Sequence, residues 1–581
     1  MPRARRPLLA PALSLLFAGA CSDDAPADGG DASSSGDESP GPSTGDDPTD
    51  TSGPPADDSS TTASEDVTGS SGDTDTSSTT DPSDTSGTTG DTDGETQPPL
   101  ELLVNALDDD GLYRFYHWRT TDEGTEGPTQ IVPSDDAHWT SAELFADRRL
   151  VYRTQVGNSD HDLHLGDLDD PDSLVQLDVD PMTTGELGWI VPIADDALLI
   201  HAYDQDELYR IDFPGGVAQP PTLVAAADGS MFSADAVVDP TGRWVAVPVP
   251  SIAGEFDVSV ARIDAPDPAG AIPVTALAPG EDAQPIAIDD VGENLFLQHA
   301  GGTSTSIEHV DLRADLPGRT TDVHTLTPTQ YVQRYVPRSG GVGMSYEVRD
   351  LGQMPPRLEV WLARVDDGEP LPPVSLVGET ESVGWQNWSP DGRWLDVDAT
   401  IDGVVRQFLV RVVDGQEPVA FEVATDVELL VFSPDSAYAY LYTYVGGVSE
   451  LARVDTSGDE PGDVEVVVQM TDRIVPGYPE DFTANGKTML IGGGANDETS
   501  QMLVDVGGPL PAVPVVANGP LPAGMWAQFG QFSPDDAYVI YIERDGVFSP
   551  KRLMVADRSR PGTATAVMDA IGSWIAVPQA R

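Results

Sequence analysis

The chain has 581 residues, of which 98 are acidic and 30 are basic, so its net charge is −68. This acidic excess repels phosphate backbones and argues against a nucleic-acid-binding protein. The single cysteine, Cys21, excludes an internal disulfide and any metal site built from several cysteines.

The first 20 residues have the composition of an export signal. Three arginines among the first six residues precede a short apolar run at 8–17, and the small residues Ala18, Gly19 and Ala20 follow it. The apolar run is too short for a membrane-spanning helix, so it predicts a signal peptide over residues 1–20.

The small residues end at Cys21, and polar residues begin directly after it. This arrangement resembles the lipobox of bacterial lipoproteins, which implies that the thiol of Cys21 carries a lipid and that the chain is cut before it. Ala18 departs from the resemblance, because the family usually has leucine there. The alternative is an ordinary secretory signal cut near Ala20. By the same resemblance Ser22 implies sorting to an outer membrane, so we expect a bacterial cell-envelope protein anchored in the membrane through Cys21.

Residues 21–98 are rich in Ser, Thr, Gly, Pro, Asp and Ala. From residue 22 to 98 there are 20 acidic residues, no basic residue, and one larger apolar side chain, Val67. Such a composition buries too little apolar surface to offset chain entropy, so it predicts a disordered acidic tether. A glycosylated stalk is the alternative. A lipobox followed by such a tether resembles lipoproteins of myxobacteria.

Residues 99–581 contain a repeated phrase: an apolar residue, a short polar turn and an alternating strand. Its clearest copies are "NWSPDGRWLDVDA" (387–399), "VFSPDSAYAYLYT" (431–443) and "QFSPDDAYVIYIE" (531–543). Successive turn anchors lie 48, 46, 50, 48, 52, 44, 50 and 50 residues apart. The anchors are Asp147, Asp195, Thr241, Val291, Ser339, Asp391, Asp435, Asn485 and Asp535. This period is typical of units with four short strands.

A second marker follows many anchors by about twenty residues. It is an Arg-apolar-Asp run that we place at the end of a third strand, as in "YRID" (209–212), "ARVD" (363–366) and "ARVD" (452–455). We expect the strand before the turn to be apolar because it lies deep in a ring, and the strand after it to alternate because one face packs on the next unit. A four-stranded unit cannot bury both faces alone, so the units must stack and close.

The "FSPDG" phrase resembles the repeats of TolB-type, WD-repeat-like β-propellers, most closely at 388–395, 432–439 and 532–539. The resemblance implies an all-β fold: one large β-propeller of about 8–10 four-stranded blades over residues 99–581, ten by repeat count. Three strands predicted within 100–133 lack an inner partner, and one predicted at 572–578 lacks its companions. Together they predict a tenth blade closed by strands from both termini.

The sequence predicts no catalytic residue. "GMSYE" (343–347) has Glu347 where a hydrolase elbow needs glycine, and pairs of carboxylates are uninformative among 78 acidic residues. A cluster of Trp385, Trp388 and Trp394 could stack sugar rings, but core packing or a contact between blades is the interpretation that we favour.

The richest group of metal-ligand residue types is "NSDHDLHLGDLDD" (158–170). A loop calcium site with Asp160 and Asp162 is one interpretation, and solvated turns are the other, which we favour. His161 and His164 are three apart, so in a strand they point to opposite faces and do not share a metal. We therefore expect no cofactor, with calcium as the one alternative.

Three functions fit this organisation, and a fold alone does not choose among them. We favour a membrane-anchored binding or scaffolding module, a monomeric ring with a protein or glycan partner. The alternatives are a carbohydrate-active enzyme, a lyase or glycoside hydrolase with carboxylates near the channel, and a structural envelope protein without a small ligand.

Overall fold

The computed structural model describes residues 99–576 apart from short gaps at 109–111, 122–123, 132–137, 146–147, 157–159, 169, 178–186, 195, 203–206, 227–235, 251–255, 266–270, 302–303, 315–316, 471–472, 476–480, 495–499, 519–520, 522–523 and 546–550. The predicted signal peptide, Cys21 and the predicted tether lie outside the described residues. In the described part no helix has the length and apolarity needed to cross a membrane.

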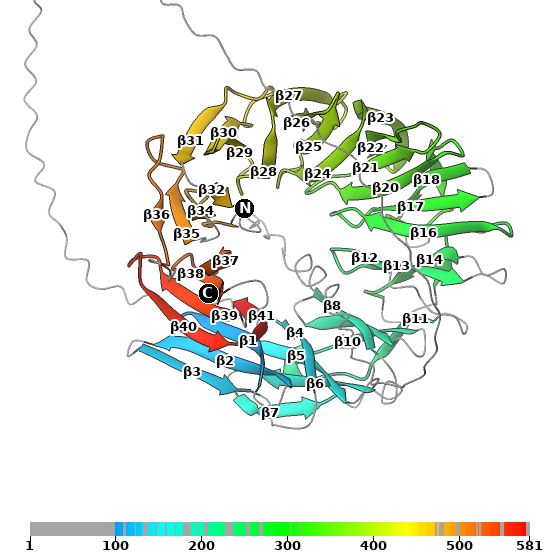
Figure 1. Ribbon diagram of the computed structural model, residues 1–581. Helices are drawn as coiled ribbons and strands as arrows, with labels where there is room; N and C mark the ends of the chain where they lie inside the picture. The colour runs from blue at the N-terminus through cyan, green and yellow to red at the C-terminus, as the bar shows by residue number, and fades with distance from the viewer. Residues whose placement is uncertain are drawn as a thin grey trace, which may run out of the picture. The chain divides into compact units, whose positions relative to one another are not determined.

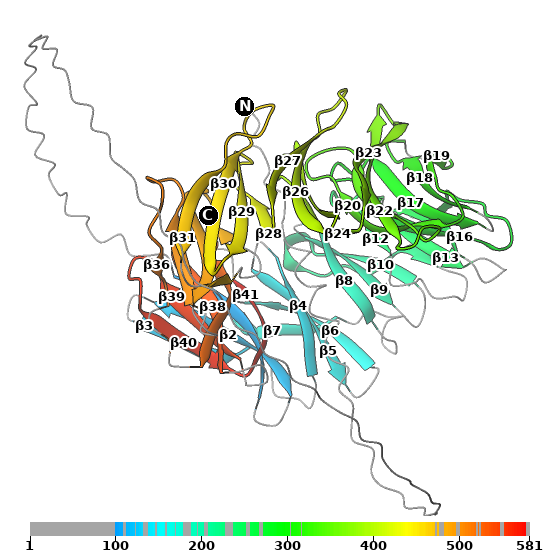
Figure 2. The same ribbon diagram turned by 45° about the horizontal axis from the view of Figure 1, so that its top comes forward.

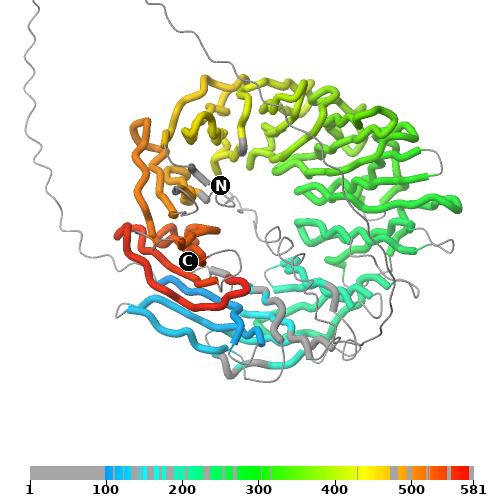
Figure 3. The backbone as a smooth tube through the Cα atoms, viewed as in Figure 1, coloured from blue at the N-terminus to red at the C-terminus, as the bar shows by residue number. Residues whose placement is uncertain are grey.

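The described chain forms ten antiparallel sheets arranged as the blades of a β-propeller, with almost no helix. Its course runs once around the ring, from blue to red in Figures 1 and 3. The all-β fold and the count of ten blades, which followed from the repeat spacing, are confirmed.

We number blades 1–9 from the first complete unit of the chain. Blade 1 has β4 (His138–Leu144), β5 (Arg149–Val156), β6 (Asp160–Asp167) and β7 (Asp170–Gln176). Blade 2 has β8 (Leu187–Ala194), β9 (Ala197–Ala202), β10 (Glu207–Asp212) and β11 (Thr222–Ala226), with the short 3-10 helix η2 (Pro214–Gly216). Blade 3 has β12 (Val237–Val238), β13 (Trp244–Pro250), β14 (Phe256–Arg262) and β15 (Ile272–Pro273).

The middle blades are the most regular. Blade 4 has β16 (Glu281–Ile288), β17 (Asn294–Gly301), β18 (Ser304–Asp311) and β19 (Thr321–Thr325). Blade 5 has β20 (Gln330–Pro337), β21 (Met344–Asp350), β22 (Arg357–Asp366) and β23 (Glu369–Thr380). Blade 6 has β24 (Ser382–Trp388), β25 (Trp394–Ile401), β26 (Val404–Arg411) and β27 (Val419–Thr425).

The last blades complete the ring. Blade 7 has β28 (Val427–Phe432), β29 (Tyr438–Val445), β30 (Val448–Asp455) and β31 (Glu465–Met470). Blade 8 has a divided first strand, β32 (Arg473–Val475) and β33 (Asp481–Phe482), then β34 (Thr488–Gly494), β35 (Ser500–Asp505) and β36 (Val515–Val516). Blade 9 has β37 (Met525–Phe532), β38 (Tyr538–Asp545), β39 (Arg552–Asp557) and β40 (Ala564–Asp569).

Blade 10 joins the two ends of the described chain, as predicted. Its strand order is β3 (Gly124–Gln130), β2 (Tyr113–Thr121), β1 (Glu101–Leu107) and β41 (Ile571–Ala576), and Figures 1 and 2 show β41 beside β1. Val104 pairs with Trp574 across these two strands. The ring is thus closed by backbone hydrogen bonds between residues more than 400 positions apart.

Ten apolar clusters hold the ring together, and each cluster joins two successive blades. In blade 2, for example, Leu198 and Ile200 pack toward blade 1, while Leu199 packs toward blade 3. Alternate residues of a strand point to opposite faces, so one apolar strand serves two interfaces. Each sheet therefore has its two faces covered only when both neighbours are present.

We expected the first strand of a blade to be the more deeply buried and the second strand to alternate, and both expectations are wrong. Second strands such as β9 and β25 are the most buried, and their residues do not alternate between buried and exposed. First strands such as β20 and β24 are mixed and partly exposed. A second strand has a strand on both sides and a blade on both faces, whereas one edge of a first strand faces the ring axis.

The repeated turn joins the first two strands of a blade, as in "SPDG" at 389–392. Ser389 Oγ donates to Asp391 Oδ1 at 2.7 Å and accepts from the Trp394 N–H at 2.9 Å. Gly392 has φ +66°, and a Cβ there would lie 2.0 Å from the Ser339 carbonyl oxygen of the preceding blade. The glycine is therefore required both by the left-handed backbone and by the close approach of the turn of the preceding blade.

Two other copies of the turn carry a larger residue at the same position. Ser436 and Asp536 keep positive φ values of 58° and 61°. Ser436 Oγ accepts from the Asp391 N–H at 3.0 Å, and Asp536 Oδ2 accepts from the Ala484 N–H at 2.8 Å. In these copies a hydrogen bond between blades accompanies the unfavourable backbone conformation.

Candidate functional site

Few large aromatic side chains of the described residues are exposed, and two of them lie on neighbouring first strands. Trp385 of β24 is 52% exposed and Tyr335 of β20 is 44% exposed. These strands belong to blades 6 and 5 and lie on the inner side of the ring (Figure 1). We call Arg334 and Trp385 the aromatic platform. Tyr335 is not part of it, because it pairs with Tyr346, whose side chain belongs to the cluster between blades 4 and 5.

Arg334 fixes the position of Trp385. Its guanidinium carbon lies 5.8 Å from the centroid of the indole, and its Nη1 donates to the Gly384 carbonyl oxygen next to the tryptophan. A cation above an aromatic face is attracted by the ring quadrupole. The arginine thus reaches from blade 5 to hold a side chain of blade 6.

A bulge presents Trp385. The pairing of β24 with β25 shifts register between Val383 and Gln386, so Gly384 and Trp385 leave the regular ladder. A bulge redirects side chains that a regular strand would point against its neighbour. The Gly-Trp pair, which breaks the apolar alternation of this strand, is the sequence signal that could have distinguished Trp385 from the two buried tryptophans.

A buried polar pair lies behind the platform. Gln386 Nε2 donates to Glu347 Oε1 at 2.9 Å, and Arg334 Nη1 lies 3.5 Å from the same oxygen. Glu347 is 1% exposed, and burial raises the pKa of its carboxyl, although Gln386 and Arg334 act in the opposite direction. Glu347, whose presence in "GMSYE" argued against a hydrolase elbow, instead binds Gln386 and Arg334 beneath Trp385.

The other two tryptophans of the predicted cluster are core residues. Trp388 is 8% exposed and donates through Nε1 to the Val336 carbonyl oxygen at 3.2 Å. Trp394 is fully buried and donates to the Thr456 carbonyl oxygen at 2.8 Å. Both bonds join two blades. Packing within the ring is therefore right for these two residues, whereas Trp385 makes the other expected kind of contact, one between blades through Arg334, and is half exposed.

Blade 4 has a separate polar hollow of about 340 Å³. Its side chains come from all four strands and lie on the face of the sheet turned toward blade 3. The residues that line it are Glu281, His299, Gly301, Ser304, Ser306, Glu308, Asp322 and Thr325. The hollow is therefore rich in carboxylates and hydroxyls and poor in apolar groups.

His299 is the centre of this hollow. Its Nδ1 lies 2.7 Å from Oε1 of Glu308, a buried residue, and its Nε2 lies 3.6 Å from Glu281 Oε2. Among the described residues, no hydrogen-bond partner reaches that Nε2. An imidazole oriented by one carboxylate can move a proton at its other nitrogen. Because no described hydroxyl reaches Nε2, the arrangement suits acid–base work or binding rather than a serine nucleophile.

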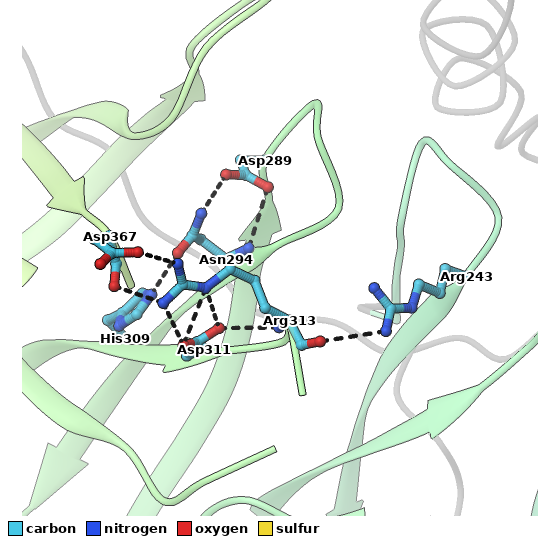
Figure 4. A network of polar contacts seen from close by, with 7 residues as sticks. All are labelled: Arg243, Asp289, Asn294, His309, Asp311, Arg313 and Asp367. Carbon is cyan, nitrogen blue, oxygen red and sulfur yellow. Dashed lines mark hydrogen bonds and ion pairs between the residues drawn. The ribbon is translucent and has the colours of Figure 1, made fainter. Parts of the chain in front are cut away.

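A further polar network joins blades 4 and 5 and is structural (Figure 4). Asn294 donates through Nδ2 to Asp289 at 2.6 Å, and its Oδ1 lies 2.9 Å from Nε2 of His309. Burial lowers the pKa of His309 to about 4 and raises that of Asp289. Beside it, Arg313 crosses to Asp367 of blade 5. Asp289, Asn294 and His309 satisfy each other inside blade 4, whereas the ion pair of Arg313 with Asp367 lies at the surface.

The calcium candidates are not in a loop or a turn. Asp160 and Asp162 lie in strand β6, where residues two apart share a face. Their side chains lie outside the described part, so the calcium hypothesis stays a prediction. Among the residues that the structure describes, no group of three His, Cys, Asp or Glu side chains is placed to hold a metal ion.

No family model and no curated protein matches the chain. Among solved structures, a crystal structure titled as the eukaryotic initiation factor is 10% identical, with a TM-score of 0.44 over 83% of this chain and 99% of that one. An oligogalacturonate lyase from Vibrio parahaemolyticus is 11% identical, with a TM-score of 0.31 over 61% and 96%. A puromycin-hydrolyzing peptidase from Mycobacterium tuberculosis is 14% identical, with a TM-score of 0.32 over 58% of this chain and 52% of that chain, so the chain spans about half its length. Likenesses this distant carry no functional argument.

Proposed function

We propose that this chain is a lipid-anchored β-propeller that binds a ligand at a bacterial cell envelope through the aromatic platform on blades 5 and 6. The observation that carries the binding role is the exposure of Trp385, 52%, on a first strand. Tryptophan is concentrated at binding hot spots because it offers a large, rigid contact area. Here Arg334 and the Glu347–Gln386 pair fix that area before any ligand arrives.

The anchor part of the proposal rests on the sequence. The export signal over residues 1–20 ends at Cys21, and residues 22–98 separate that cysteine from the ring. A lipid on Cys21 with this acidic spacer would hold the propeller away from an outer membrane. The turn phrase "SPDG" supports a relationship to TolB-type, WD-repeat-like propellers. The proposed partners are the membrane and a protein or glycan, with no nucleic acid, and the proposed state is a monomer.

A second function has one observation in its favour. The pair of His299 and Glu308 faces a hollow with Glu281 at its edge, which is the arrangement of an acid–base site. A carbohydrate-active enzyme, a lyase or a glycoside hydrolase, would use these groups for proton transfer. We rank this function below binding because the described residues of the hollow include no aromatic side chain to hold a sugar ring.

Retention of envelope material tests the binding function. The full-length chain carrying Cys21→Ser, immobilised, is exposed to separated polysaccharide and protein fractions of envelope extracts, with and without calcium. We expect one fraction to be retained by this protein. The same fraction should not be retained by the protein that carries both Cys21→Ser and Trp385→Ala. Tyr444→Ala, which removes another exposed aromatic, is the control. Equal retention by the Trp385→Ala protein would remove the platform from the function.

Turnover separates the two functions. If the chain is an enzyme at blade 4, the retained polysaccharide is shortened with time, and His299→Gln stops the shortening without affecting retention. If it is a binding module, the retained material is recovered at its original length. Mass spectrometry of the mature N-terminus tests the anchor: a lipidated Cys21 as the first residue supports it, and an unmodified cysteine contradicts it.

A further inference from the structure

We propose that the ligand of the aromatic platform is a neutral sugar ring that stacks on the indole of Trp385. This inference rests on the binding function proposed above and adds the chemical class of the ligand.

The first step is the shape and fixation of the indole. About half of the surface of Trp385 is accessible, at 52%, and Arg334 holds the ring from one side. An aromatic face carries the negative part of the ring quadrupole. The C–H groups on one side of a pyranose are weakly positive and lie in one plane, so they match such a face. A preorganised ring loses little conformational entropy when the sugar binds.

The second step concerns charge. Residues 99–581 include 78 acidic and 27 basic residues, which gives this part a net charge of −51. A field of this sign repels anionic ligands over several ångströms. Arg334, the cation of the platform, is already engaged by the Gly384 carbonyl oxygen and by Glu347, 3.5 Å away. It is therefore placed to hold Trp385 rather than to receive a carboxylate, so a neutral ligand fits better than an acidic sugar.

The third step concerns the surroundings. Besides Arg334 and Trp385, the exposed residues of the same two strands are Gln333, Tyr335, Ser382 and Asn387, of which three are polar and two are amides. Amides donate to and accept from hydroxyl groups, which a sugar presents around its rim. A hot spot for a protein partner instead lies in an apolar interface core, and the contacts around it exclude water. Next to the platform the strands offer polar groups, which favours a glycan over a protein partner.

The test uses the full-length chain carrying Cys21→Ser and soluble oligosaccharides of defined charge. The neutral probes are cellohexaose, maltohexaose and the hexamer of N-acetylglucosamine, and the acidic probe is hexagalacturonate. Binding is measured by calorimetry and by the change in tryptophan fluorescence. We expect at least one neutral probe to bind more tightly than the acidic probe. Trp385→Ala should weaken it at least tenfold, whereas Trp385→Phe, which keeps an aromatic face, should weaken it less than Trp385→Ala.

The outcomes separate this inference from the function on which it rests. If no neutral probe binds, or if Trp385→Ala binds it as the unsubstituted chain does, the ligand class is wrong. If the envelope fraction is nevertheless lost from the Trp385→Ala protein, the binding function stands with a ligand of another class. If Trp385→Ala changes neither measurement, both proposals fail. Circular dichroism and thermal unfolding of each variant confirm that the ring is intact.

Discussion

Arg313 of blade 4 donates through Nη1 to Asp367 Oδ1 of blade 5 at 2.8 Å and through Nη2 to the Asp367 carbonyl oxygen at 2.5 Å (Figure 4). Arginines near the third strands of other blades make comparable bonds to backbone carbonyls of the next blade. They are Arg210 to Ile263 at 2.7 Å, Arg364 to Gln416 at 3.0 Å and Arg453 to Val506 at 2.8 Å. The Arg-apolar-Asp runs at 209–212, 363–366 and 452–455 therefore mark contacts between blades.

Arg338 is a buried arginine that also bonds to the next blade, and its substitution tests how much such a contact contributes to stability. Its Nε donates to the Gly392 carbonyl oxygen at 2.8 Å, and its Nη1 lies 2.6 Å from Asp414. We expect Arg338→Met to lower the free energy of unfolding by about 2–3 kcal/mol, because charge-assisted bonds across a blade interface are lost. Denaturant unfolding measures the change. Arg560→Met, at a side chain that is 79% exposed, is the control and should cost less than about 1 kcal/mol. Equal effects of the two variants would contradict the role of Arg338.

Gly392 and Gly403 provide a matched pair for the turn. Both have positive φ, +66° and +73°, but only at Gly392 would a Cβ meet a neighbour, the Ser339 carbonyl oxygen. We expect Gly403→Ala to cost about 1 kcal/mol from backbone strain alone. Gly392→Ala should cost at least about 2 kcal/mol more, because the turns of two blades must separate. Unfolding midpoints in urea compare the variants. A Gly392→Ala protein as stable as Gly403→Ala would show that these turns do not pack tightly.

His309 should make stability depend on pH. Burial lowers its pKa to about 4 from the ordinary value of 6.5. Between these values the unfolded chain binds a proton that the folded chain does not, so stability falls as the pH falls from about 6.5 to about 4. The full effect is on the order of 3 kcal/mol, since one pKa unit corresponds to about 1.4 kcal/mol.

The His309→Gln variant removes this titration and keeps a side chain that can donate to Asn294. We expect the difference in unfolding free energy between pH 7 and pH 4.5 to be smaller in the variant than in the unsubstituted chain. Carboxyls with a raised pKa, such as that of Asp289, increase the unfolding free energy as the pH falls, which is opposite to the effect of His309. They are present in both proteins, so the difference between the two pH dependences reports on the histidine. An identical pH dependence in the two proteins would rule out His309 as the source.

Removal of residues 571–581 should open the ring. It deletes β41, which pairs with β1 from Leu102 to Ala106 and contributes Ile571 and Trp574 to the cluster between blades 9 and 10. The exposed edge of β1 then has unpaired backbone groups and apolar side chains, which favours aggregation. We expect faster proteolysis and oligomers in size-exclusion chromatography. The chain without residues 577–581 keeps β41 and should behave as the intact protein. A monomeric, protease-resistant 571–581 deletion would mean that closure does not stabilise the ring.

Local patterns in the sequence predicted the candidate site only in part. Trp385, Trp388 and Trp394 look alike in the chain, yet two are core residues and one is exposed. The difference comes from a register shift in β24, which the Gly384-Trp385 pair marks in the sequence but which is recognised only once the pairing with β25 is known. His299 and Glu308 are nine positions apart and become partners because β17 and β18 pair in one particular register. Neither residue belongs to a motif that can be recognised in the sequence.

What the sequence by itself determined is the repeat: turns about 48 residues apart, most of them anchored by a residue with a side-chain oxygen, and apolar strands between them. A repeating four-stranded unit with two apolar faces has to stack, so nine blades followed from the spacing of the turns, and the tenth blade with the joined ends followed from the unpartnered strands predicted at 100–133 and 572–578. Only the tertiary structure decided which residues are exposed on the inner strands and which arginine reaches which neighbour. These properties arise between blades, where two distant segments meet, and the spacing of residues within one blade contains no information about that contact.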